Sequence, residues 1–208
     1  MPPGRHGLER EFVVKNQRDR LTAGIITVVA DRGYHEASVT QICAAAGVSR
    51  RTFYSYFASK EECYLEAFNL VNDHLVQVMG EAGAEGDEWP VLARERILAM
   101  LEAFAANPDL ARFALIAPVR AGSEFAVHYR QALERLFQSL VEAKPEGVRQ
   151  AAPAIEQAMM GGMMALIARW VEEGKGEALL SLAPDLTELF LSPYVGSTAA
   201  ERAAGPLR

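Results

Sequence analysis

The chain has 208 residues, half of them hydrophobic, and a formal net charge of −6 at pH 7. This length predicts one compact unit plus a larger domain that can bury a sizeable core. The acidic total argues against a nonspecific nucleic-acid binder.

The charge is distributed unevenly along the chain. Residues 1–60 contain nine Lys/Arg and five Asp/Glu, whereas residues 61–208 contain twelve Lys/Arg and twenty-two Asp/Glu. This asymmetry predicts that any attraction to DNA is confined to the amino-terminal part. Arg5 and Arg10 precede the first expected helix, and they are interpreted either as an arm toward a groove of DNA or as a tail.

Several classes of protein are excluded by the composition. No stretch reaches the roughly 18 uncharged apolar residues that would span a membrane, and the amino terminus lacks an apolar signal segment. Cys43 and Cys63 are the only cysteines, so no disulfide framework is expected. We therefore expect a cytoplasmic protein. The two cysteines are interpreted as small buried side chains, with a redox role as the alternative.

Apolar residues recur at helical spacing, and no alternating strand pattern or internal repeat is visible, so we predict an all-α protein. The first helix is expected from about residue 12 to residue 32, where Gly33 ends it. Ser123 is predicted to cap a long later helix. After a pair of short helices at 38–57, helical segments are expected at about 60–80, 107–117, 123–140 and 153–173. A helix that carries Ile97, Leu101 and Phe104 is expected to run to about residue 106, and a last helical region that carries Leu182, Leu186, Leu189 and Phe190 is expected after Gly176.

The first of the two short helices begins after Ser38, whose hydroxyl can cap the free N–H groups of the first turn. Ile42 and Ala46 lie on one face of this helix. Gly47 stands where the end of a helix needs a residue that tolerates left-handed φ. These residues predict a short helix followed by a tight turn.

A second short helix follows this turn directly. Ser49 is expected to cap it, so the helix begins at Arg50. Phe53 and Phe57 are four residues apart and should face inward. Two short helices joined by a turn at glycine are typical of a helix-turn-helix, whose second helix enters the major groove of DNA.

The outer side of this second helix carries side chains suited to DNA. Arginine can pair with guanine and the threonine methyl group can meet thymine, whereas tyrosine and serine hydroxyls suit phosphate. Lys60 follows the cap Ser59 and is expected to form an anion site with the N–H groups of the helix it opens. The predicted DNA contacts are Ser38, Ser49, Arg50, Arg51, Thr52, Tyr54, Ser55, Tyr56 and Lys60.

Each of these residues also has a simpler interpretation. Serines before helices are usually caps, paired arginines are usually solvated surface, and the aromatic residues of 53–57 can be the core of a small bundle. At this spacing, with glycine between the two helices, the set as a whole favours DNA binding.

Residues from about 21 to 68 resemble the DNA-binding domain of the tetracycline-repressor (TetR) family. The family usually has a small residue at the position of Arg51, and often has His at Tyr56 and Ala at Cys43. The resemblance rests on Ser38, Ile42, Ala46-Gly47-Val48-Ser49, Thr52-Phe53-Tyr54, Phe57 and Ser59-Lys60-Glu61.

This resemblance implies an amino-terminal three-helix DNA-binding domain at residues 1–60 and a carboxy-terminal helical bundle for ligand binding and dimerisation at residues 61–208. It implies a homodimer that binds a palindromic operator in double-stranded DNA. It favours a repressor that a small apolar effector releases from this operator. No cofactor and no metal site are expected.

The helix expected at 153–173 is apolar on two sides, so it must be buried on several sides. One face is predicted to enter the core of its own chain and the other to meet a partner subunit. The alternative is that both faces serve one core. The predicted dimer contacts are Met160, Met164, Ile167, Val171, Leu186, Leu189 and Phe190.

The resemblance also implies an effector pocket between the central helices, a common place for small-molecule sites. The candidate lining is mostly apolar, with a few polar groups to orient a ligand. Ordinary core packing is the simpler interpretation of each residue. The candidates are Met100, Phe104, Phe113, Ile116, Phe125, His128, Tyr129, Met163 and Trp170.

The sequence does not favour an enzyme. Its four histidines form no metal-type cluster, it has no glycine-rich phosphate loop, and no Ser or Cys stands in a nucleophile motif. No catalytic residue is therefore predicted. A helical protein-interaction adaptor with a vestigial helix-turn-helix remains as the alternative function.

Overall fold

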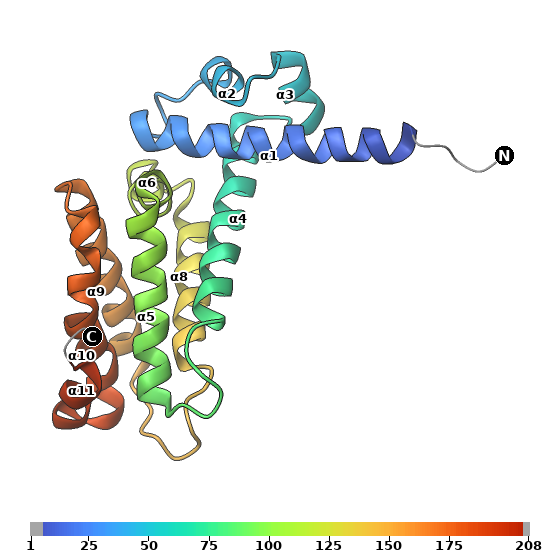
Figure 1. The fold of residues 1–208 in the computed structure, drawn as a ribbon. Helices are drawn as coiled ribbons and strands as arrows, with labels where there is room; N and C mark the ends of the chain where they lie inside the picture. Colours follow the sequence, from blue (N-terminus) through green and yellow to red (C-terminus); the bar gives the residue numbers. More distant parts are fainter. Residues whose placement is uncertain (1–5, 206–208) are drawn as a thin grey trace. The chain divides into compact units, whose positions relative to one another are not determined.

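The computed structural model describes residues 6–205, and the side chains from residue 16 onward. The all-helical prediction is confirmed, and no strand occurs within these residues. Arg5 and the side chain of Arg10 lie outside the described part. The elements (Figure 1) are α1 (His6–Arg32), α2 (Val39–Ala46), α3 (Arg50–Tyr56), α4 (Lys60–Gly80), α5 (Trp89–Ala106), α6 (Pro108–Leu115), α7 (Ala117–Arg120), α8 (Ala126–Val141), α9 (Pro153–Glu172), the 3-10 helix η1 (Gly176–Leu182), α10 (Ala183–Val195) and α11 (Ser197–Ala204).

The backbone contacts divide the chain into two compact units, Met1–Leu70 and Val71–Arg208. The sequence prediction placed this division after residue 60, at the start of α4. The first turns of α4 instead pack in the amino-terminal unit, where the Tyr64 ring lies 5.0 Å from the Tyr34 ring and 6.1 Å from the Phe68 ring, centre to centre. The helix α4 therefore belongs to both units.

The core of the amino-terminal unit is built from the apolar stripe of α1 and the inner faces of α2 and α3. Leu21, Ile25, Ile42 and Phe53 are fully buried, and Phe57 is 1% exposed. These positions lie on one side of each helix, as the spacing of three and four residues requires.

Glycine allows α1 and α2 to approach closely. A Cβ atom at Gly24 would lie 3.0 Å from the carbonyl oxygen of Ile42 and 3.2 Å from the backbone nitrogen of Ala46. Backbone atoms inside a helix cannot move aside as a flexible side chain does, so a larger residue would force the two helices apart.

The end of α8 is held by two side chains of α5. The indole N–H of Trp89 donates to the carbonyl oxygen of Leu140 at 2.8 Å, and the guanidinium of Arg96 donates to that of Ser139. Carbonyl groups in the last turn of a helix have no intrahelical partner, and the negative end of the helix dipole favours a cation. These two hydrogen bonds therefore fix α8 on α5.

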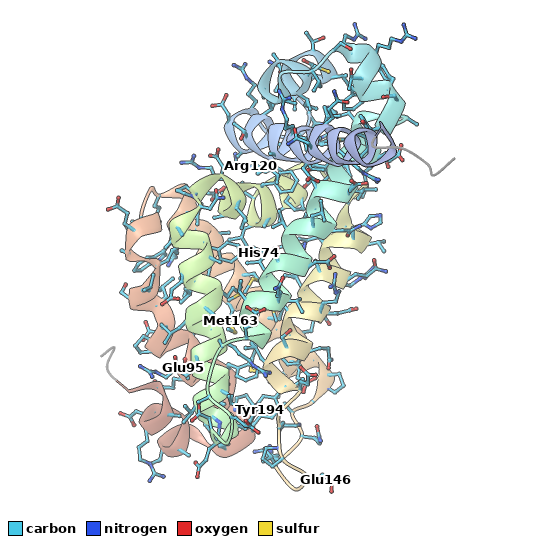
Figure 2. All side chains as sticks on the ribbon, turned by 45° about the vertical axis from the view of Figure 1, so that its right-hand side comes forward. His74, Glu95, Arg120, Glu146, Met163 and Tyr194 are labelled. Atoms are coloured by element: carbon cyan, nitrogen blue, oxygen red, sulfur yellow. The ribbon has the colours of Figure 1, made fainter. Side chains whose placement is uncertain are left out.

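An aromatic cluster joins α5, α8 and α10 in the carboxy-terminal unit. The Trp89 ring packs edge-on against Phe190 at 6.0 Å and against Tyr194 at 5.4 Å between centroids. Phe137 contacts Phe190 in the same way at 5.8 Å. Tyr194, labelled in Figure 2, also donates a hydrogen bond of 2.8 Å to Glu156 of α9.

The structure differs from the predicted element bounds in three places. The helix α1 begins at His6, earlier than expected, and α11 was not predicted. Ser123 does not cap α8, because this helix begins at Ala126 without a side-chain cap. Ser123 lies instead in the exposed turn that follows Gly122.

Most of the predicted dimer contacts are buried within one chain. Most of both apolar stripes of α9 packs inside this chain, where the helix contacts α6, α8, α10 and η1. Of the seven predicted contacts, Leu189 is 44% exposed and remains available to a partner. The other six are at most 5% exposed: Met160, Met164, Ile167, Val171, Leu186 and Phe190.

Most of the predicted effector-binding residues lie in the core of the carboxy-terminal unit, where Figure 2 labels Met163. Tyr129 lines a groove between α8 and α9. Ile116, His128 and Trp170 are half-buried. The remaining five are at most 1% exposed: Met100, Phe104, Phe113, Phe125 and Met163.

Replacing Gly24 by alanine should lower the free energy of unfolding by about 1–3 kcal/mol, because α1 and α2 must separate to admit the methyl group. Chemical denaturation followed by circular dichroism measures this change. Gly80→Ala is the matched control, since a Cβ atom there meets nothing within 4 Å. Equal stability of the two variants would contradict the close approach of α1 and α2.

Candidate nucleic-acid interface

The turn between α2 and α3 has the geometry that the sequence predicts. The Ser38 hydroxyl accepts from the backbone of Gln41 at 3.3 Å, and the Gln41 side chain accepts from the backbone of Ser38 at 2.8 Å, which completes a capping box. Gly47 has a φ of +62°, and the N–H of Val48 donates to the carbonyl of Cys43 at 3.0 Å. The left-handed glycine therefore ends α2 and directs the chain into α3.

The orientation of α3 is set by its buried aromatic side chains. Phe53 and Phe57 face the core, with their ring centroids 5.7 Å apart. Ser49 caps the helix by accepting from the backbone N–H of Thr52 at 3.0 Å. The opposite face therefore points to solvent, and it carries the exposed residues Arg50, Arg51, Tyr54 and Ser55.

Two of these exposed side chains are cations without a partner. Among the described residues, neither Arg50 nor Arg51 makes a side-chain hydrogen bond or an ion pair. Tyr54 is 51% exposed beside them. Two free guanidinium groups in the first turn of an exposed helix can pair with base edges or with phosphates.

Ser49, Thr52 and Ser55 are partly engaged within α3. The Ser49 and Thr52 hydroxyl oxygens lie 2.9 Å apart, and the Ser55 hydroxyl donates to the carbonyl of Thr52 at 2.6 Å. The Ser38 hydroxyl likewise donates to the Gln41 side chain at 2.7 Å. These hydroxyls stabilise the motif, and their contacts to DNA remain predictions.

Lys60 has a structural role that its sequence position did not indicate. Its ammonium group donates to the carbonyl oxygens of Tyr34 at 2.7 Å and Ala37 at 2.8 Å, and lies 4.2 Å from the centre of the Tyr34 ring. Two of its three donors are thus used on the loop between α1 and α2. Lys60 therefore acts as a clamp on this loop, and a phosphate must compete with these acceptors, so its contact to DNA stays a prediction.

Tyr56 also differs from its prediction. Its hydroxyl donates to the Gln17 side chain of α1 at 3.1 Å, and the residue is half-buried. The donor that was expected to meet a phosphate is therefore used to hold α3 against α1. Tyr56 therefore acts as a positioning residue, and its contact to phosphate stays a prediction.

Three side chains in one turn of α1, which sequence reasoning missed, hold the other three helices of this unit. Gln17 binds α3 through Tyr56, and Arg20 donates to the carbonyl of Gly47 at 3.1 Å. Arg18 forms a bidentate ion pair with Glu66 of α4, which raises the pKa of Arg18. No motif in the sequence marks these pairs, because their partners lie far along the chain.

The two cysteines are free and buried. Burial raises the pKa of the Cys63 thiol to about 12 and also raises the pKa of Cys43. A thiol with a raised pKa is mostly protonated at neutral pH and reacts slowly. This agrees with the interpretation of both residues as small core side chains.

Residues 21–67 match the family model described as "Bacterial regulatory proteins, tetR family". This segment of the chain is a TetR family DNA-binding domain. The predicted family and its helix-turn-helix are thereby confirmed, and the family consists of DNA-binding transcriptional regulators rather than enzymes.

Similar proteins include two curated regulators. The transcriptional activator FasR of Mycolicibacterium smegmatis is 35% identical over 88 residues, which are 42% of this chain and 38% of FasR. The fatty acid metabolism regulator protein of Bacillus subtilis is 34% identical over 56 residues, which are 27% of this chain and 29% of that protein. The chain thus matches less than half of the length of each relative.

Two solved structures share the fold over nearly the whole chain. The fatty acid degradation regulator FadR of Bacillus halodurans has a TM-score of 0.73 and 22% identity, and the match covers 84% of this chain and 94% of that structure. FadR of Bacillus subtilis, in complex with stearoyl-CoA, has a TM-score of 0.72 and 20% identity, with 85% and 97% covered.

The described residues give no indication of a membrane span or a metal site. No helix within residues 6–205 is long and apolar enough to cross a bilayer. In the same part of the chain, no three His, Cys, Asp or Glu side chains gather where they could hold a metal ion.

Tyr56→Phe should lower the free energy of unfolding by about 0.5–1.5 kcal/mol, because the hydrogen bond to Gln17 is lost. It should leave the salt dependence of DNA affinity unchanged. Tyr54→Phe is the matched variant on the exposed face. It should keep the wild-type free energy of unfolding and weaken DNA binding. Chemical denaturation and fluorescence anisotropy with labelled duplex measure the two effects. If Tyr56→Phe instead had wild-type stability and weak DNA binding, the result would support a phosphate contact by Tyr56 and contradict its positioning role.

Proposed function

We propose that this protein is a ligand-responsive, sequence-specific transcriptional regulator in the cytoplasm. In this proposal a homodimer binds a palindromic operator as a repressor, and a small apolar effector releases it. The unpaired guanidinium groups of Arg50 and Arg51 on the exposed face of α3 carry the proposal, because the buried Phe53 and Phe57 leave them no role in the core.

Arg50, Arg51 and Thr52 are the proposed base readers, and Tyr54 is the proposed phosphate contact. Base contacts specify the sequence, whereas phosphate contacts fix the register and make the affinity fall with salt. Two recognition helices about one turn of DNA apart read a palindrome, since the symmetry of the dimer matches that of the operator.

The proposed dimer uses a surface other than the predicted stripes. The exposed side of α9 carries small residues outside the groove-lining set, which we call the small-residue face: Ala158, Gly162 and Ala165. A Cβ atom at Gly162 would meet nothing within 4 Å in this chain. This glycine is thus not required by the fold of one chain, and it allows a partner helix to approach closely.

A fatty acyl derivative is the proposed effector class. The structure of Bacillus subtilis FadR contains stearoyl-CoA, and a curated relative is a fatty acid metabolism regulator. The effector acts only through a difference in affinity for two states of the protein. The helix α4 belongs to both units, so it is the proposed route by which the effector lowers operator affinity.

Selection of bound duplexes from a random DNA pool tests the DNA-binding part of the proposal. Purified protein should enrich a palindrome that an Arg50/Arg51/Tyr54 triple-alanine variant does not. Expression of a reporter gene behind the enriched operator then distinguishes a repressor, which lowers it, from an activator, which raises it. The relative FasR is described as an activator. A folded protein that enriches no sequence at moderate salt would favour the protein-interaction adaptor instead.

Arg51→Ala should relax base preference at one position in each half-site and weaken operator binding by about 1–3 kcal/mol, if its guanidinium pairs with a base. Quantitative binding to the operator and to its single-base variants measures this. Arg112→Ala, an exposed arginine of the other unit, is the control. A uniform loss of affinity across all sequences would make Arg51 a phosphate contact.

Gly162→Leu should shift the protein toward monomer and weaken operator binding, because the new side chain projects from the small-residue face. Sedimentation equilibrium measures the dimer, and circular dichroism checks the fold. Gly80→Leu adds the same bulk at a position with equal free space, and it should leave the dimer intact. An unchanged dimer in Gly162→Leu would exclude close contact at this face.

A further inference from the structure

A groove lies between α8 and α9 in the carboxy-terminal unit. Its volume is about 590 Å³, which is within the range of roughly 300–1,000 Å³ typical of small-molecule sites. Its lining runs along α8 from Tyr129 to Gln138 and along α9 from Pro153 to Gly161. The groove is therefore elongated and follows the two helix axes.

The middle of the groove is apolar. Leu133 and Phe137 are one turn apart on α8, and Met160 faces them from α9. Phe137 is held in place by its edge-on contact with Phe190. Methionine adapts its shape to what it contacts. This combination of one fixed ring and adaptable aliphatic side chains suits a flexible apolar chain rather than a rigid ring system.

One end of the groove offers two hydrogen-bond donors. Tyr129 and Arg130 are neighbours that both line the groove. Within the described part of the chain, neither side chain forms a hydrogen bond or an ion pair. Burial raises the pKa of Tyr129, so its hydroxyl keeps its proton and can donate. A guanidinium and a phenol that line the same groove can bind a carboxylate or a phosphate.

The carboxylates of the groove restrict where a negative charge can lie. Glu134 follows Arg130 by one turn, and Glu156 lines the α9 side, where it already accepts a hydrogen bond from Tyr194. A second anionic group along the groove would meet these carboxylates and be repelled. The favoured position for an anion is thus the end formed by Tyr129 and Arg130.

We propose that the α8–α9 groove binds an amphiphile with one flexible apolar chain and an anionic headgroup. The chain lies along Leu133, Phe137 and Met160, and the headgroup binds Tyr129 and Arg130. This rests on the proposed function for the effector class, but it places the effector in the groove rather than among core residues such as Phe104, which is 1% exposed.

Calorimetric titration of the full chain with palmitate, palmitoyl-CoA and CoA alone tests the proposal. Palmitate carries a carboxylate and palmitoyl-CoA carries phosphates, so their relative affinities show which headgroup is used. CoA without an acyl chain should bind at least tenfold more weakly than the preferred amphiphile, because it leaves the apolar middle of the groove empty.

Two groove variants and two matched controls locate the site. Leu133→Gln and Arg130→Gln should each weaken amphiphile binding by about tenfold or more. Leu70→Gln and Arg112→Gln make the same changes at exposed positions outside the groove, and they should bind as wild type. Arg130 is exposed, so its variant should keep the fold even if Leu133→Gln loses stability.

Wild-type affinity in both groove variants would overturn the site while leaving the proposed effector class intact. A wild-type protein that binds neither palmitate nor palmitoyl-CoA would overturn the ligand class itself. Selection from the random DNA pool is independent of both results, so a failure here is distinguishable from a failure of the DNA-binding function.

Discussion

The burial of Phe53 and Phe57 is the constraint on which the DNA-binding surface depends. Each aromatic side chain removed from water contributes about 1.5–3 kcal/mol, so rotation of α3 about its own axis would be strongly opposed. The left-handed backbone at Gly47 sets where α3 begins, and the two rings set which face is inward. Arg50, Arg51 and Tyr54 reach solvent as a consequence, without needing a contact that holds them there.

Local signals account for what the sequence predicted well. The caps at Ser38 and Ser49, the glycine turn and the spacing of the two phenylalanines all act within a few residues, so the helix-turn-helix was predicted with its correct bounds. The helix α9 was predicted nearly to the residue for the same reason. Helical periodicity showed that both of its faces were apolar, but it did not show what covers them.

Long-range contacts account for the side-chain roles and the groove that could not be predicted from the sequence. The ammonium of Lys60 and the hydroxyl of Tyr56 were assigned to DNA, yet both bind acceptors more than twenty residues away in the chain. The apolar residues of α9 were predicted to serve both the core and a partner, whereas most of them pack against four other elements of the same chain. The groove between α8 and α9 depends on how two helices pack against each other across the chain segment that joins them, and the periodicity of each helix does not show this.

The hydrogen bond from Trp89 to the end of α8 has a spectroscopic consequence. The chain has two tryptophans, Trp89 and Trp170, and both belong to the carboxy-terminal unit. Trp89 is 3% exposed and held against Leu140, whereas Trp170 is half-buried on α9. DNA docks on a unit that has no indole, so a change in tryptophan emission when operator is added reports a response of the other unit. The protein thus carries its own optical probe for the communication along α4 that we propose.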